Sequence, residues 1–246
     1  MLKRAGLASA NLFAAATAVG AESGPVAPRE GELKIVVVGG HPGDPEYGCG
    51  GTVARFTDLG HEVTLLYLND GAWEDIPAST RVGEAKAACD ILKARPAYAG
   101  QRNGHAIVDE EHYDAFAKVL MDLKPDAVFT QWPIDNHRDH RAASVLTYDA
   151  WRKTHHAFAL YYYEVSNGED TVQFSPTHYV GIQEAESRKK AACFAHASQT
   201  PERYYALQDE VARFRGLESG RTRAEAFTFL VQSPFDVLTR LSDGPK

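Results

Sequence analysis

The chain has 246 residues, of which 44% are hydrophobic and 24% charged, an ordinary globular composition that can bury the core of one large domain. The formal net charge of -7 and the lack of a long basic run argue against nucleic acid or an anionic membrane as the main partner. The three cysteines form neither a zinc-finger pattern nor a disulfide framework.

The N-terminal segment has the three parts of a secretory signal peptide. A basic start is followed by an uncharged run rich in Ala and Leu, and Val19-Gly20-Ala21 supplies small residues at a cleavage position. The apolar run is too short to span a bilayer comfortably, so we expect no transmembrane segment after signal removal. The alternative is a helical or disordered extension of a cytosolic protein. We predict an exported protein, periplasmic or extracellular, with a signal peptide over 1–21, a linker over 22–32, one domain over 33–235 and a tail over 236–246.

Apolar, β-branched runs alternate with amphipathic segments along the rest of the chain. The predicted strands cover residues 33–38, 62–68, 97–100, 126–131, 158–165, 177–182 and 227–231. The predicted helices cover residues 49–59, 79–94, 109–123, 142–151, 185–196 and 202–216. Such alternation indicates βαβ units, and therefore an α/β fold: a Rossmann-like three-layer sandwich with a mostly parallel central sheet.

Two polar clusters follow predicted strands. His41 and Asp44 come after the first strand, and His137 and His140 come after the strand over 126–131. Because the carboxyl ends of parallel strands share one edge of the sheet, the two clusters can face each other. Two histidines and a carboxylate that leave one position open describe a catalytic zinc site. The proposed ligands of this single zinc ion are His41, Asp44 and His140.

The remaining polar residues of the second cluster suit supporting roles. Asp139 or Asp135 can orient a ligand histidine through its other ring nitrogen. His137, as an imidazolium, can stabilise or protonate the oxyanion that forms when water attacks a carbonyl.

Four segments also resemble the PIG-L/LmbE-type N-acetylglucosaminide deacetylases. In chain order they are His41–Thr52, Arg81–Ala85, His137–Ala143 and Ala195–Gln199. The resemblance implies zinc-dependent hydrolysis of an N-acetyl group on an amino sugar or glycoconjugate, the substrate being a small molecule or a glycan. It carries metal ligation to the same three residues, the oxyanion role to His137, and the tuning of that histidine to Asp139.

One position departs from the family pattern. Gly43 stands where the family has the aspartate that acts as general base. Glu46, Asp135 or Asp70 could replace it, or the reaction could run without a dedicated base. A third reading is a catalytically weak or inactive relative that binds zinc or carbohydrate.

Aromatic and basic residues near the clusters are candidates for substrate binding. Trp73 and Trp132 follow the carboxyl ends of strands, where they could stack on a sugar ring or simply pack in their loops. Arg81 could reach the substrate or form a helical ion pair with Glu84.

Overall fold

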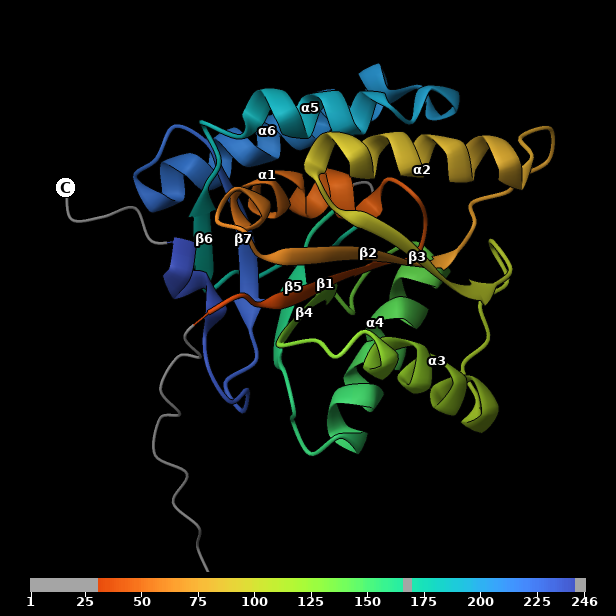
Figure 1. Ribbon diagram of the computed structural model, residues 1–246. Coiled ribbons are helices and arrows are strands. Elements are labelled where there is room, and N and C mark those ends of the chain that lie inside the picture. The colour runs from red at the N-terminus through yellow and green to blue at the C-terminus, as the bar shows by residue number, and fades with distance from the viewer. Residues whose placement is uncertain (1–30, 166–169, 242–246) are drawn as a thin grey trace, which may run out of the picture.

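The computed structural model describes residues 31–165 and 170–241, and the predicted signal peptide lies outside these ranges. Its centre is a seven-stranded sheet in the order β3-β2-β1-β4-β5-β7-β6 (Figure 1). The strands are β1 (Lys34–Gly39), β2 (Glu62–Asn69), β3 (Arg95–Gln101), β4 (Ala127–Gln131), β5 (Ala159–Tyr163), β6 (His178–Gly181) and β7 (Ala224–Phe229).

Most of the sheet is parallel, as predicted. The pairs from β3 through β2, β1 and β4 to β5 are parallel, whereas β7 runs antiparallel to both β5 and β6. The central strands β1 and β4 are buried along almost their whole length, which is why their sequences are continuous apolar runs.

Helices cover both faces of the sheet and complete three layers (Figure 1). One layer holds α1 (Asp44–Asp58), α2 (Ala78–Leu92), α5 (Glu186–Phe194) and α6 (Pro201–Ser219). The other holds α3 (Glu110–Asp122) and α4 (Arg138–Lys153). Each layer has its own hydrophobic cluster against the sheet. Within the described ranges, none of these helices combines the length and apolar character needed to cross a membrane.

Helix α1 starts earlier than the pattern predicted, at Asp44 instead of Cys49. Its first turn is acidic, and Pro45 is tolerated there because its missing N–H would have no helical partner. Gly48, Gly50 and Gly51 lie inside the helix, where they allow close packing. A Cβ at Gly48 would lie 2.3 Å from the ring of Tyr163.

Three other boundaries differ from the prediction. Helix α4 begins at Arg138, so His140 is helical and not part of a loop. The predicted helix over 185–196 ends at Phe194 and is followed by a short 3₁₀ helix, Ala197–Gln199. A second 3₁₀ helix, Val237–Leu241, packs on the core past the predicted domain end at 235.

Gly48→Ala should destabilise the fold by about 1–3 kcal/mol, since the added methyl must displace Tyr163 or shift the helix. Gly83→Ala is the matched control, because Gly83 is an exposed helical position with no atom near the new methyl. That control should gain up to about 1 kcal/mol from helix propensity. Urea unfolding of both variants measures the difference, and equal midpoints would contradict the packing argument.

Candidate metal centre

The two polar clusters meet at the carboxyl edge of the neighbouring strands β1 and β4. The turn after β1 supplies His41, and the first residue of α1 supplies Asp44. His137 is the N-cap of α4, and His140 lies in the first turn of that helix. The structure therefore brings together the four residues expected to form the centre of the site.

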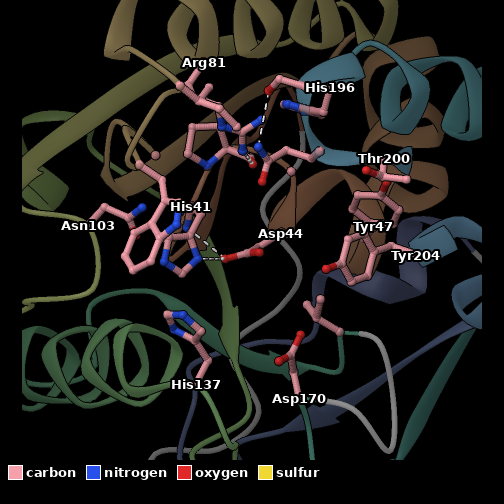
Figure 2. Close-up of a pocket in the computed structure, with 18 of the residues that line it drawn as sticks. His41, Asp44, Tyr47, Arg81, Asn103, His137, Asp170, His196, Thr200 and Tyr204 are labelled. Carbon is pink, nitrogen blue, oxygen red and sulfur yellow. Dashed lines mark hydrogen bonds and ion pairs between the residues drawn. The ribbon is translucent and has the colours of Figure 1, made fainter. Parts of the chain in front are cut away.

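Asp44 lies between two imidazole rings (Figure 2). Its Oδ2 is 3.1 Å from Nδ1 of His41 and 3.2 Å from Nε2 of His140. Two ligand atoms on a tetrahedral zinc ion, each about 2.0–2.1 Å from the metal, are about 3.3 Å apart. Each ring nitrogen is thus as far from the Asp44 oxygen as two ligand atoms of one zinc ion are from each other.

Both histidines proposed as ligands, His41 and His140, contact a buried carboxylate on the side of the ring away from Asp44. Nε2 of His41 is 3.2 Å from Oδ2 of Asp139, and Nδ1 of His140 is 3.1 Å from Oδ1 of Asp135. Such pairs fix the ring orientation and raise the basicity of a metal-binding histidine. Asp139 and Asp135, the two acids expected to orient a histidine, therefore both do so: Asp139 orients His41, and Asp135 orients His140. The Asp139 carboxylate contacts His41 and not His137, the partner that the family resemblance implied.

The two supporting carboxylates are themselves fully hydrogen-bonded. Asp135 also accepts bonds from the backbone N–H of His137 and the hydroxyl of Thr171. Asp139 accepts from the Asn69 amide and from the backbone N–H groups of residues 104 and 106. Because every oxygen is engaged, neither acid is placed to take a proton from water in the cavity.

The charges of the three central groups support one another. Burial raises the pKa of Asp44, but the His140 and His41 imidazoles outweigh it and hold that pKa well below its usual range. Burial lowers the pKa of His140, yet Asp44 and Asp135 together raise it to about 10. A divalent cation bound by these atoms would take over the positive charge that the protonated imidazole supplies.

His137 stands beside this group as a neutral ring. Burial lowers its pKa, and the neighbouring His41 and His140 lower it further, to about 4. Its Nδ1 accepts the backbone N–H of Asp139 at 3.2 Å, which leaves the proton on Nε2. The expected imidazolium is therefore replaced by a neutral N–H donor. The ring centroid lies 4.5 Å from that of His41, so the three histidines also form a group able to hold a metal.

The backbone at Gly43 adopts a conformation that favours glycine, with φ 114° and ψ -41°. Its N–H donates to Oε2 of Glu46 at 3.1 Å. Glu46 is fully buried, accepts the Tyr67 hydroxyl at 2.7 Å and lies 3.0 Å from Nε2 of His196. Glu46 therefore supports the turn and does not line the cavity, which rules it out as the replacement base.

A cavity of about 590 Å³ opens over the metal centre. Trp73 lines it and is 53% exposed, so its ring is available to a ligand. Arg81 also lines it, but is almost completely buried and donates to the Pro42 carbonyl and to Glu84. The ion pair with Glu84 is therefore confirmed, whereas contact of Arg81 with a substrate stays a prediction.

Trp132 does not line the cavity. Its ring packs edge-on against Tyr162 and Phe174. Of the two roles expected for Trp132, stacking on a sugar or packing in its loop, the structure has the packing role. The pattern analysis assigned no individual role to several other residues that line the cavity, because no spacing of residue types singles them out. They are Tyr47, Asn103, Asp170, Thr200, Arg203 and Tyr204.

These features define a class: a three-layer α/β protein with a histidine-rich group, able to hold a metal, at the carboxyl edge of its parallel strands. Residues 36–151 match the family model described as PIG-L: GlcNAc-PI de-N-acetylase. Residues 36–151 are therefore a PIG-L family domain.

Named proteins are similar to this chain over most of its length. A diacetylchitobiose deacetylase from Thermococcus kodakarensis is 25% identical over 221 residues, covering 80% of this chain and 83% of the relative. An N,N'-diacetylchitobiose deacetylase from Pyrococcus horikoshii has a TM-score of 0.71 at 22% identity, covering 84% of this chain and 88% of that one. GalB, a 4-carboxy-2-hydroxymuconate hydratase from Pseudomonas putida, also has a TM-score of 0.71, at 20% identity, covering 80% and 96%. These two structures establish the shared fold.

Asp135→Asn should weaken binding of Zn²⁺ by about 10–100-fold, because the amide cannot hold the His140 ring as a carboxylate does. Calorimetric titration of the metal-free protein with Zn²⁺ measures the change. Asp70→Asn is the control, since Asp70 does not line the cavity and its amide can still accept the Ala72 N–H. Equal affinities in all three proteins would contradict the supporting role of Asp135.

Proposed function

We propose that the protein is a zinc-dependent hydrolase that removes an N-acetyl group from an amino sugar or glycoconjugate. The observation that carries the proposal is the set of contacts made by His41 and His140. Each ring contacts Asp44 with one nitrogen and a separate buried carboxylate, Asp139 or Asp135, with the other. The 25% identity to a diacetylchitobiose deacetylase supports the choice of substrate class.

His41, Asp44 and His140 would hold the zinc ion. When bound, the ion polarises the acetyl carbonyl and lowers the pKa of the attacking water. The chain contributes a fixed ligand geometry, because Asp139 and Asp135 prevent either ring from turning. No side chain needs to reorganise as the reaction proceeds.

His137 would stabilise the oxyanion. The Asp139 N–H keeps the proton of His137 on Nε2, and the ring lines the cavity beside His41. A neutral donor is suited to this role, since it forms a hydrogen bond to the developing negative charge without repelling the metal.

The cavity walls provide the surface for a sugar. A volume of about 590 Å³ is within the range of pockets that hold small-molecule ligands. The exposed Trp73 ring can stack on the apolar face of a pyranose. Arg81 acts on the site through the Pro42 carbonyl, which it holds next to His41.

Gly43 favours a second candidate, a catalytically weak relative that binds zinc and carbohydrate. The two candidates differ in one measurement. Bound zinc without acetate release from any N-acetylated hexosamine would support the binding protein, whereas acetate release supports the hydrolase.

His140→Ala and His137→Ala should separate metal binding from catalysis. Loss of the His140 imidazole removes a ligand, so both zinc content and acetate release should disappear. Loss of His137 should leave zinc in place and lower kcat by about 10²–10³-fold. Zinc content is measured by atomic absorption and acetate by an enzymatic assay. Zinc loss in the His137 variant would reassign that residue as a ligand.

We also propose export, with residues 1–21 as a cleaved signal peptide, on the basis of their basic start, apolar run and small residues. Expression of the full chain in a bacterium should yield a mature protein that begins at Glu22 and is found outside the cytoplasm. N-terminal sequencing of the fractionated protein tests this. An intact Met1 on the recovered protein would favour the cytosolic alternative.

A further inference from the structure

We propose that Asp170 is the carboxylate that replaces the missing general base. This inference rests on the proposed function and adds a catalytic residue to the same site. Asp170 lies on the loop between β5 and β6, in a stretch whose sequence resembles no motif. It is half-buried and, like His137, lines the cavity (Figure 2).

The other candidate acids are excluded because none of them lines the cavity. Glu46 is buried beneath the turn and bonded to Tyr67. The carboxylates of Asp135 and Asp139 hold His140 and His41, and Asp70 lies outside the lining. Among the described residues, the lining of the cavity contains only two carboxylates, Asp44 and Asp170. Since Asp44 is a metal ligand, Asp170 is the acid that remains.

The position of Asp170 is defined by the second polar cluster. Its carbonyl oxygen accepts the Asn136 N–H at 2.8 Å, and the next residue, Thr171, forms a β-bridge with Asp135. The Thr171 hydroxyl then donates to the Asp135 carboxylate at 3.1 Å. These contacts fasten the backbone of Asp170 to the loop that leads into α4.

The Asp170 carboxylate is close to the reacting centre. One of its oxygens lies within 4.8 Å of a His140 ring nitrogen and of an Asp135 oxygen. At such a separation, one water molecule in the cavity can lie between the Asp170 carboxylate and the His140 ring. Figure 2 shows Asp170 facing the cavity from the side opposite the His41 turn.

The step that this carboxylate would carry out is balanced in protons and electrons. The water oxygen forms a bond to the acetyl carbon, the carbonyl π pair moves to the carbonyl oxygen, and one water proton passes to the Asp170 carboxylate. The carbonyl then re-forms as the C–N bond breaks, the electron pair of that bond goes to the nitrogen, and the nitrogen takes the proton back from Asp170. The products are acetic acid and the amine, which pass the second water proton between them to leave acetate and an ammonium group, and the Asp170 carboxylate is regenerated.

The test compares Asp170→Asn with wild type and with Asp70→Asn, a carboxylate outside the cavity. We expect Asp170→Asn to lower kcat by about 10²–10⁴-fold with a small change in KM, while Asp70→Asn keeps wild-type kinetics. Asp170→Glu should recover part of the loss. Zinc affinity, measured by calorimetry, should be the same in all four proteins.

Two results would overturn the inference. Unchanged kcat in Asp170→Asn means that no proton passes through this residue. Loss of zinc in Asp170→Asn means that Asp170 is a ligand, in the alternative group that it forms with Asp135 and His140.

A binding measurement separates this inference from the proposed function. Acetohydroxamate binds zinc, and its N–OH group takes the position of the attacking water. A carboxylate that accepts the proton of this group strengthens binding, so the affinity shows whether such a carboxylate is present, without any turnover. We expect Asp170→Asn to weaken acetohydroxamate binding at least tenfold in the zinc-loaded protein. If wild type releases no acetate, the proposed function fails, and this affinity still decides whether Asp170 faces the reacting position. Equal affinities would overturn the inference.

Discussion

The carboxylate of Asp44 lies between the imidazole of its own turn, His41, and that of helix α4, His140. Burial alone would favour the neutral form of all three groups, so their charges persist only because each one stabilises its neighbours. The surrounding residues keep this arrangement rigid. Buried carboxylates hold the far side of both rings, and the backbone of residues 104 and 106 holds one of those carboxylates in turn.

The same constraint explains the shape of the turn after β1. Asp44 must begin helix α1 and face His140, so the residue before it completes a sharp turn at a positive φ. Gly43 fits this conformation without strain, and Glu46 returns from the first turn of the helix to bind its N–H. A family member with an acid at this position gains a base there. This chain has a turn that favours glycine, and any base has to come from elsewhere.

The PIG-L fold supports more than one chemistry, because its catalytic groups lie on loops and helix ends at the edge of the sheet. A deacetylase and a hydratase both share most of this architecture. In this chain the loop after β5 lies against the loop that leads into α4, and so adds Asp170 to the cavity. Variation in such a loop can change which acids line the cavity while His41, Asp44 and His140 stay in place.

Local sequence patterns alone were sufficient to predict the fold class and the centre of the site. The alternation of apolar runs and amphipathic helices was sufficient for the parallel sheet, and the spacing within two clusters was sufficient to bring His41, Asp44 and His140 together, because the strand ends share one edge. The roles of the other acids depended on contacts between distant segments. Glu46, a predicted replacement base three residues after Gly43, is buried and bonded to the Tyr67 hydroxyl, whereas Asp170, in a loop without a motif, lines the cavity. Periodicity specifies which face of an element is buried, but only tertiary packing decides which carboxylate is left in contact with water.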